Sequence, residues 1–509
     1  MSAVGSILTN TGALQALNAI SNTSASNNNL EAQLSSGLSI NSPSNNPAGY
    51  ITAQGFTSQL NGITQAVSNA NQGVSLLQTA QGAITQQIGI VQQLNSISVQ
   101  AANGTQTPAE SQSLQNLVGQ LTSQVSSIAN QTQFNNINLL NGSFSGVQFQ
   151  VGANEGQTST LSINNLTASA IGLNATTVSG TTVYGTNVKS TSAALTLAAS
   201  AAKIASGAAG KFTVATTAAT ELSITGQNGG NAGIATGTKQ ESAASLASAI
   251  NNVSGTTGVQ AQSTTTITLA LGTAGAGAGY SFAIQAGKGS GGTNGSGIGT
   301  KQTITASSAA QIVSQINGQS STSGIIASLN STSGQVQLTQ SAGYNINITG
   351  TSSGSLKTVG ATASVIKSGA GTASAVIQGQ VQFQSSGAFS VGNASNVGLS
   401  SKSSLTSLSS INVSTTAGAN TAINVVKYAL GALNNQGGQL GAVQQALTAN
   451  INNLNATSQN LTTALGVVQD ANIPAVSNQL TEASIQAQSG VAALKNSTQL
   501  QQSYLSLLP

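Results

Sequence analysis

Residues 60–94 read LNGITQAVSNANQGVSLLQTAQGAITQQIGIVQQL, with apolar side chains at steps of three and four. This spacing predicts a long helix over residues 50–100 with one apolar seam. A second apolar stripe beside the seam indicates that the helix buries more than one face, as in a helical bundle. The seam consists of Leu60, Ile63, Val67, Val74, Leu77, Ile84, Ile88 and Val91.

The C-terminal part of the chain carries the same apolar spacing. It predicts a second long helix that ends before Pro474, because proline is tolerated in the first turn of a helix and not in its interior. After Pro474 the seam resumes, and the small residue Gly490 on it allows a partner helix to approach closely. The seam consists of Leu430, Leu433, Leu440, Leu447, Ile451, Leu454, Leu461 and Leu465, followed by Val476, Leu480 and Leu494.

Two further helical segments are weaker in pattern. One begins at about Pro108 and is expected to pack back, antiparallel, on the helix of residues 50–100. Its expected inner face consists of Leu114, Leu117, Leu121, Val125 and Ile128. The other lies at the N-terminus, where the polar run SNTSASNNN, residues 21–29, interrupts a thin seam of Leu14, Leu17, Ile20, Leu30 and Leu34. Because such thin seams bury little, we expect the terminal segments to be disordered in the isolated chain and to fold on assembly.

The middle of the chain, residues 143–417, is rich in Gly, Ser and Thr and contains short alternating runs. Alternation of polar and apolar residues is typical of strands, so this part is predicted to be β-rich. The runs are VQFQV, TITLAL, QVQLT and YNINIT.

A tandem repeat lies inside this middle part. SAASLASAIN from Ser242 matches SAAQIVSQIN from Ser308, and GVQA from Gly258 matches GIIA from Gly324, both at an offset of 66 residues. Each unit is expected to form one helix followed by three strands, so the repeat predicts two related outer modules.

The composition excludes most kinds of active site. Charged residues make up 4% of the chain, against roughly 25% in an ordinary globular protein. Arg, His, Cys and Trp are absent, so no imidazole base, thiolate nucleophile, Ser-His-Asp triad or metal site with thiolate or imidazole ligands can form. We therefore expect no enzyme, no cofactor and no metal ion.

The remaining candidate sites have simpler interpretations. GKGSGG at residues 287–292 matches a dinucleotide-binding pattern, but more Gly and Ser follow it instead of a helix, so we interpret it as a linker. A hydrolytic carboxylate pair would need the fold to bring together residues such as Glu221 and Glu241. The scattered lysines, which give a net charge of +4, do not form the basic patch that nucleic acid requires.

The N-terminal residues MSAVGSILTNTGALQALNAI lack the basic region and apolar core of a cleaved secretory signal. The sequence also has no run of about 18 apolar residues, so no membrane insertion is expected. If the protein leaves the cell, we expect it to use another export route.

Several blocks of the sequence resemble bacterial flagellins. The most specific begins at Leu34 and reads LSSGLSINSPSNNPAGYITAQGFTSQLNGITQAVSNANQGVSLLQTAQGAI. Similar blocks are QTQFNNINLLNG from Gln131, FQVGANEGQ from Phe149, LGAVQQALTANINNLNATSQNLT from Leu440 and the tail QAQSGVAALKNSTQLQQSYLSLLP. The repeat in the middle is similar to a short motif of flagellin and filament-cap insertions.

The resemblance implies an α+β fold in which helical segments from both ends form a long coiled-coil-like bundle, with β-rich outer domains inserted between them. Its parts would be terminal helices at residues 1–43 and 466–509 in the filament core, a helical tube domain with a β-hairpin at 44–175 and 405–465, and outer domains at 176–404 with tandem repeats at about 242–284 and 308–348. The apolar seams would then serve self-assembly.

The function implied is that of a structural subunit that polymerises into the flagellar filament for swimming motility. The implied location is extracellular, on the flagellum, after export through the flagellar type III channel without a cleaved signal. The implied partners are further copies of the chain, an export chaperone, the cap and the junction proteins. A hook-filament junction protein and a cell-surface adhesin are alternatives, and the complete FQVGAN and LSLL blocks favour the filament subunit.

Some positions depart from the usual flagellin pattern, mostly by loss of charge. Ser39 stands where an Arg is usual, and the segment similar to the Toll-like-receptor epitope has Gln93, Ser96 and Ile97 in place of Arg, Glu and Leu. We expect weak or absent receptor activation.

Loss of ion pairs is also expected of a filament that works in acid, where carboxylates lose their charge near pH 4. A glycan coat or compositional drift is the alternative explanation.

Overall fold

The computed structural model describes residues 10–177, 183–186, 188–190, 222–226, 230–234, 242–271, 279–287, 299–330, 333–353, 355–359, 364–367, 374–377, 379–392 and 402–505. The chain divides into two compact units. Unit 1 comprises Met1–Gln81, Ser145–Ser162 and Gln439–Pro509, and unit 2 comprises Gly82–Phe144 and Ile163–Gly438.

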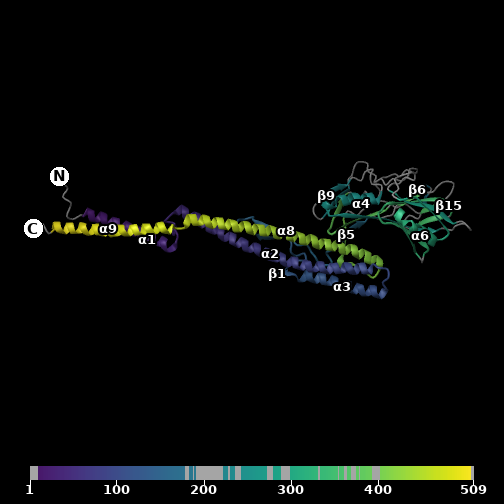
Figure 1. The fold of residues 1–509 in the computed structure, drawn as a ribbon, viewed down its shortest axis with the longest axis horizontal. Helices are drawn as coiled ribbons and strands as arrows, with labels where there is room; N and C mark the ends of the chain where they lie inside the picture. The colour runs from purple at the N-terminus through teal and green to yellow at the C-terminus, as the bar shows by residue number, and fades with distance from the viewer. Residues whose placement is uncertain are drawn as a thin grey trace. The chain divides into compact units, whose positions relative to one another are not determined.

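Long helices occupy both ends of the chain, as the apolar spacing predicts (Figure 1). They are α1 (Thr11–Ser36), α2 (Pro47–Ala101), α3 (Pro108–Gln131), α8 (Thr416–Gln469) and α9 (Ile473–Leu505). Pro474 lies in the first turn of α9, where its missing N–H costs no helical hydrogen bond. A β-rich region lies between the helical ends in the sequence, so the α+β fold class is confirmed.

Helix α1 continues through the polar run SNTSASNNN without a break. The side chain of Asn10 accepts a hydrogen bond from the N–H of Ala13 at its start, and Gly37 ends it in the left-handed region at φ 74°. None of its residues is buried. Its packing within the chain therefore adds little stability, and the expectation that it folds only on assembly stays a prediction.

Helix α3 begins with a capping box in which Thr107 and Glu110 satisfy each other's backbone N–H groups. One expected member of its inner face was wrong. Leu117 is 40% exposed, whereas Val118 is 1% exposed. Steps of four, three and four residues from Leu114 follow one face of a helix and lead to Val118 instead. The buried side chains of α3 are Ser111, Val118, Leu121, Thr122, Val125 and Ala129.

Short hairpins lie near these helices in the sequence. In unit 1, β3 (Val147–Gln150) pairs antiparallel with β4 (Thr158–Leu161), which forms the expected hairpin. In unit 2, β1 (Gln133–Phe134) pairs with β2 (Ile137–Asn138) across a two-residue turn. Asn135 and Asn136 in this turn have positive φ angles of 49° and 61°, which asparagine tolerates better than most residues.

Among its described residues, the β-rich part of unit 2 contains two large antiparallel sheets and one small one. The strand order is β21-β5-β19-β10-β16-β17-β7 in a nine-stranded sheet, with β14 and β13 attached beside β10, β12-β11-β15-β18-β6 in a five-stranded sheet, and β20-β8-β9 in the small sheet. The helices are α4 (Ala243–Asn252), α5 (Ser254–Thr257), α6 (Ala309–Gly318) and α7 (Ser320–Ser323). The strands are β5 (Gly172–Thr177), β6 (Val183–Thr186), β7 (Val188–Ser190), β8 (Leu222–Thr225), β9 (Asn231–Ile234), β10 (Gln260–Leu271), β11 (Tyr280–Gly287), β12 (Gln302–Ala306), β13 (Ile325–Asn330), β14 (Gln335–Gln340), β15 (Asn345–Ser353), β16 (Ser355–Val359), β17 (Ser364–Lys367), β18 (Ser374–Ile377), β19 (Gln380–Ser385), β20 (Ser390–Gly392) and β21 (Ser404–Ser407).

The second repeat forms the predicted helix and three strands, α6 followed by β13, β14 and β15, but the first repeat does not. In the second repeat, the chain turns between β13 and β14, with Gly334 at φ 64°. In the first repeat, the matching residues form the single strand β10. The first repeat has three fewer residues at this point and no glycine, so it cannot make the turn.

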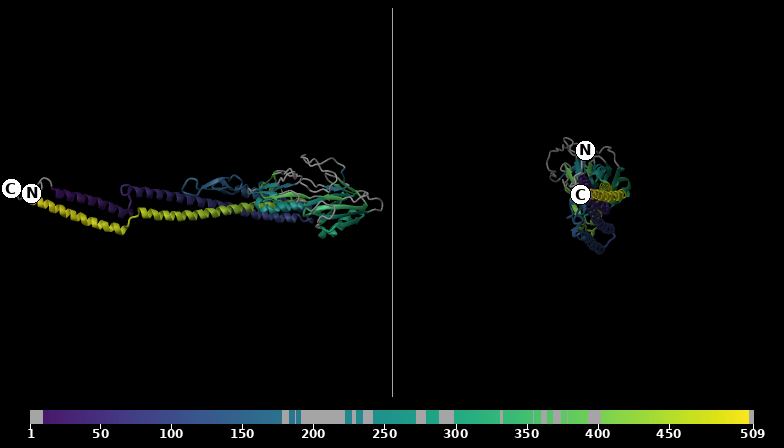
Figure 2. Two further views of the ribbon diagram at one scale, coloured as in Figure 1. Left: turned by 90° about the horizontal axis from the view of Figure 1, so that it is seen from above. Right: turned by 90° about the vertical axis from the view of Figure 1, so that its left-hand side faces the viewer.

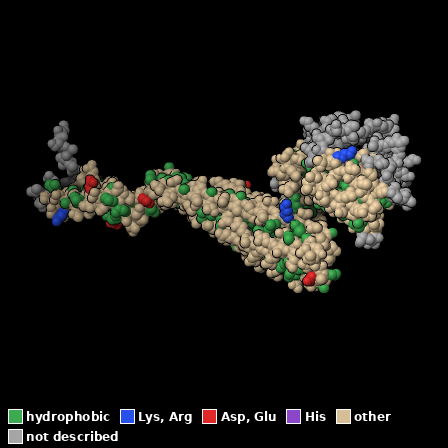
Figure 3. Space-filling model, turned by 45° about the vertical axis from the view of Figure 1, so that its right-hand side comes forward, with side chains coloured by type: hydrophobic (Ala, Val, Ile, Leu, Met, Phe, Trp, Pro, Cys, Tyr) green, Lys and Arg blue, Asp and Glu red, His purple; other side chains and the backbone are tan. Residues whose placement is uncertain are grey.

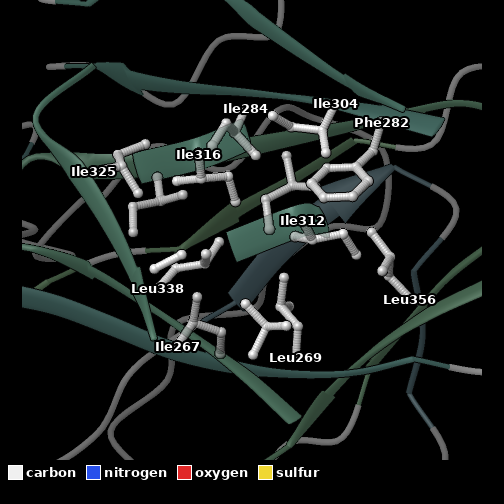
Figure 4. Packing of buried hydrophobic residues seen from close by; sticks show 14 of the residues in the cluster. Ile267, Leu269, Phe282, Ile284, Ile304, Ile312, Ile316, Ile325, Leu338 and Leu356 are labelled. Atoms are coloured by element: carbon white, nitrogen blue, oxygen red, sulfur yellow. The ribbon is translucent and has the colours of Figure 1, made fainter. Parts of the chain in front are cut away.

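Each repeat helix covers its own apolar core. The core around α6 contains side chains from the large sheets, including Phe282, Ile304 and Leu338, and α6 contributes Ile312 and Ile316 (Figure 4). The core around α4 contains Leu246, Ile250 and Phe383, among others. Strand β10 contributes to both cores, so it joins the two modules. The carboxylates Glu221 and Glu241 and most of GKGSGG lie outside the described residues.

Candidate assembly surfaces

Helices α1 and α9 lie side by side and run antiparallel in unit 1 (Figure 2). The side-chain amide of Asn10 donates to Ser497 and Gln501 at one end, and Ile20 lies beside Gly490 near the middle. A Cβ atom added at Gly490 would lie 2.9 Å from Cγ1 of Ile20. The small residue therefore permits the close approach that the sequence predicts.

The two chain ends also meet where α1 and α8 end. Leu38 and Asp470 form an isolated antiparallel bridge. The N–H of Ser39 donates to the carbonyl oxygen of Gln469 at 2.7 Å, and its hydroxyl donates to the same oxygen at 3.2 Å. The N–H of Ala471 donates to the carbonyl oxygen of Gly37 at 2.9 Å. This junction is therefore built from uncharged hydrogen bonds at the position where flagellins usually have an Arg.

The predicted seam residues face inward in the single chain. Ile63, Leu77, Ile84, Val91, Leu433, Leu440, Leu447 and Val476 are buried. The half-buried ones are Leu60, Val67, Val74, Ile88, Leu430, Ile451, Leu454, Leu461, Leu465, Leu480 and Leu494. They serve packing within the chain, and their further use in assembly stays a prediction.

Close contacts join α2, α8 and the hairpin within unit 1. Gly73 lies beside Leu447 and Phe149, because a Cβ atom added there would be 3.2 Å from Cδ1 of Leu447 and 3.7 Å from Cδ1 of Phe149. The side-chain amide of Asn69 donates to the carbonyl oxygen of Gln150 at 3.1 Å. The region of residues 69–73 thus holds the hairpin on α2.

A second set of apolar side chains points away from the helix pairs of unit 1. The sequence placed Leu14, Leu17 and Leu34 on the inner seam of α1, which was wrong, because they are 52%, 54% and 37% exposed. The seam residues Ile20 and Leu30 are half-buried as predicted, as are Ala13 and Ala16, and Ile20 lies beside Gly490 of α9. The exposed large apolar residues of unit 1 are Leu14, Leu17, Leu34, Ile51, Val467, Ile473, Ile485, Val491 and Leu500.

Few charged side chains interrupt these surfaces (Figure 3). Unit 1 contains Glu31, Glu155, Asp470, Glu482 and Lys495 among its described residues, and all are exposed. A contact between such surfaces would therefore rest mainly on apolar groups and on uncharged amides and hydroxyls.

Two ionisable groups of unit 2 have shifted pKa values. Hydrogen bonds from the backbone and side chain of Thr107 lower the pKa of Glu110 below its ordinary value. Burial raises the pKa of Tyr428 to about 12, and its hydroxyl lies 3.2 Å from Oε1 of Gln260. Both groups are thus held in the form they already have at neutral pH, the ionised carboxylate and the neutral phenol.

Two glutamines are buried in the helical part of unit 2. Nε2 of Gln87 donates to the carbonyl oxygens of Val125 and Leu166 at 2.9 and 3.2 Å. Oε1 of Gln436 accepts from the N–H of Asn164 at 3.2 Å. These amides tie α2 and α8 to the segment after the hairpin. The burial of these two glutamines was not predicted, because glutamine is usually exposed and neither residue belongs to an apolar seam.

The positions similar to the receptor epitope lie on α2. Gln93 and Ser96 are exposed, and Ile97 is buried. An uncharged amide and a hydroxyl therefore occupy the exposed positions that usually carry Arg and Glu.

The described residues contain no group of three or more His, Cys, Asp or Glu side chains placed to hold a metal ion. Within the same part of the chain, no helix has the length and apolar character needed to cross a membrane.

Comparison with known proteins assigns the helical ends. The model of the bacterial flagellin N-terminal helical region matches residues 7–145, and that of the C-terminal helical region matches residues 423–508. Both ends of the chain belong to the bacterial flagellin family. These matched ranges are called the flagellin ends below, and residues 146–422 lie outside both.

Curated relatives agree with the flagellin assignment. The phase 1 flagellin of Salmonella naestved and the flagellin of Salmonella budapest are each 36% identical to this chain over 168 residues. That alignment covers 33% of this chain and 33% of each relative, so the chain spans about a third of the length of the relatives it matches.

Solved structures also show likeness to the chain. FliC from Burkholderia pseudomallei is 20% identical, with a TM-score of 0.29 over 74% of this chain and 99% of that one. The flagellar junction protein FlgL from Legionella pneumophila is 11% identical, with a TM-score of 0.28 over 83% of this chain and 99% of that one. Both scores are too low to show a shared fold.

Proposed function

We propose that the chain is a structural subunit that polymerises into the bacterial flagellar filament. The observation that carries the proposal is the pairing of the two flagellin ends, with apolar side chains left on their outer sides. Contacts between copies would bury these side chains, at a gain of roughly 25 cal/mol per Å² of apolar surface. A heterologous contact whose rotation does not close produces an open helical polymer.

In this proposal, residues 1–43 and 466–509 line the filament core and residues 44–175 and 405–465 form the surrounding tube. The outer modules of residues 176–404 project from it. The protein would act outside the cell, without enzymatic activity, and its proposed partners are an export chaperone, the cap and the junction proteins. A junction protein is less favoured, because the curated relatives at 36% identity are flagellins.

Electron microscopy of the purified full-length chain tests this proposal. We expect long helical filaments that form without another protein once short filament seeds are added. A variant in which Leu14, Leu17 and Val491 are changed to Ser should remain monomeric, whereas changing the exposed Ser24, Ser26 and Ser489 to Ala should not prevent growth. A wild-type chain that stays monomeric with seeds would overturn the proposal.

We further propose that the chain activates the Toll-like receptor for flagellin weakly or not at all. The exposed Gln93 and Ser96 lack the charges usual at these positions, so ion pairs with a receptor would be missing. A cell-reporter assay should give low potency, and a double change of Gln93→Arg and Ser96→Glu should raise it. Normal potency of the unchanged chain would refute this proposal.

A further inference from the structure

Side-chain amides close the outer edges of strands in both repeat modules. The amide of Asn317, at the end of α6, makes two hydrogen bonds to one residue of β13. Nδ2 donates to the carbonyl oxygen of Ala327 at 2.8 Å, and Oδ1 accepts from its N–H at 2.7 Å. A neighbouring strand would use the same two backbone groups. The side chain therefore occupies the place of a strand partner.

The first repeat has the same arrangement at an offset of 66 residues. Nδ2 of Asn251 donates to the carbonyl oxygen of Ala261 at 3.0 Å, and Oδ1 accepts from its N–H at 2.7 Å. The hydroxyls of Thr257 and Ser323 also accept from the next outward N–H groups, those of Val259 and Ile325. Because both geometries recur, they belong to the module and are not an accident of one surface.

Helix α6 closes a second edge as well. Nε2 of Gln315 donates to the carbonyl oxygen of Thr305 at 2.7 Å, and Oε1 accepts from its N–H at 3.1 Å. Thr305 lies on β12, the last strand of the five-stranded sheet, and β13 pairs only with β14 among the described strands. One helix thus supplies an amide to the open edge of each large sheet.

The edge that Asn317 covers would otherwise suit strand pairing. Ile326 and Leu329 on β13 are 56% and 41% exposed, so the strand offers apolar side chains as well as backbone groups. Open edges of this kind pair with strands of other molecules. The nearest such strand in a polymer is that of another copy of this chain.

We propose that Asn317 and Gln315 block strand pairing between the outer modules of neighbouring copies. The edges of β13 and β12 are interaction surfaces for a second copy that the two amides keep closed. The choice of another copy as the partner rests on the proposed filament, whereas the closing of the two edges is tested on the single chain.

Hydrogen exchange in the full-length chain tests the first step. Asn317→Ala should speed exchange of the Ala327 amide by about tenfold, since its one partner is lost. The Leu338 amide, on the paired strand, should change little. Ser314→Ala, at an exposed position on the same helix, serves as the matched control. Equal exchange at Ala327 in the wild type and in Asn317→Ala would overturn the proposal.

Peptide binding tests the second step. A fluorescent peptide with the sequence of β13, IIASLN, should bind the Asn317→Ala, Gln315→Ala double variant and neither the wild type nor the control. Because the readout uses soluble monomer, it is separate from the filament test. If the double variant remains folded by circular dichroism but does not bind the peptide, the amides only tether α6, and the proposal is wrong.

Asn317→Asp provides a pH-dependent check. The introduced carboxylate would face the carbonyl oxygen of Ala327, so its pKa in the folded chain should be raised above the unfolded value of about 4. When the introduced carboxyl group is protonated, its O–H can again donate to the carbonyl oxygen of Ala327. Peptide binding should therefore be absent below pH 4 and appear as the pH rises, whereas pH-independent binding would contradict the proposal.

Discussion

Ser39 donates two hydrogen bonds to the carbonyl oxygen of Gln469, one from its backbone N–H at 2.7 Å and one from its hydroxyl at 3.2 Å. The two residues are 430 positions apart in the sequence and join the N- and C-terminal parts of unit 1. Flagellins usually have an Arg at the position of Ser39. At this junction the chain therefore has uncharged hydrogen bonds where a charged side chain is usual.

Removing the hydroxyl should weaken the junction without abolishing it. Ser39→Ala leaves the backbone hydrogen bond intact, so we expect a loss of about 0.5–1.5 kcal/mol in stability. Thermal dissociation of filaments, followed by light scattering, measures the effect. Ser35→Ala, at an exposed position on α1, is the control and should leave the transition unchanged. Equal transitions for both variants would show that the hydroxyl does not contribute.

The close approach of α1 and α9 depends on Gly490. Gly490→Ala places a Cβ atom 2.9 Å from Cγ1 of Ile20, which should cost about 1–3 kcal/mol through overpacking. Filament stability measures the loss, and Ile20→Ala in the same chain, which removes the γ carbon that the new atom would meet, should restore part of it. Gly441→Ala, where nothing lies within 4 Å of the added atom, should instead stabilise α8 by up to about 1 kcal/mol. A neutral Gly490→Ala would contradict the packing.

Buried Gln87 should matter more for stability than its exposed neighbour. Gln87→Leu leaves the carbonyl oxygens of Val125 and Leu166 without their donor, and we expect a loss of about 1–3 kcal/mol. Gln86→Leu, at an exposed position on the same helix, should have little effect. Urea unfolding of the monomer measures both changes. A stabilised Gln87→Leu chain would mean that the amide is not required there.

The cap of α3 should be the acid-sensitive part of the helical ends. Hydrogen bonds from Thr107 lower the pKa of Glu110 in the folded chain. Its contribution to stability is therefore complete above the unfolded pKa and is lost as the pH falls through the lowered folded pKa. Glu110→Ala should destabilise the chain at pH 7 and have a smaller effect at pH 2, measured by thermal unfolding. Gln112→Ala should have the same effect at both pH values, and a Glu110→Ala effect that grows in acid would contradict the assignment.

The helices were predictable because burial repeats along them with a fixed period. Their inner faces were less certain where small residues decide the packing. Leu14 and Leu17 were predicted to lie on the seam of α1, yet they are exposed, and the neighbouring Ala13 and Ala16 are half-buried. The sequence of α1 alone does not show which face its partner accepts.

The contacts in unit 2 that depend on partners distant in sequence were not predictable. Gln87 and Gln436 lie outside the apolar pattern of their helices. Predicting β10 as one continuous strand would have required recognising that the first repeat is too short to form the turn. One sign of the edge contacts is visible in the sequence, because Asn251 and Asn317 occupy equivalent positions in the two repeats. The repeat could be read from the sequence, but the backbone groups that the two side chains bind could not.

The central claim is that the flagellin ends assemble through apolar surfaces and uncharged hydrogen bonds. Sedimentation of preformed wild-type filaments between pH 7 and pH 2 tests it most directly, since carboxylates lose their charge near pH 4 while amides and hydroxyls do not change. We predict that the pelleted fraction at pH 3 equals that at pH 7. Filaments that are stable at pH 7 and depolymerise at about pH 3 would contradict the claim.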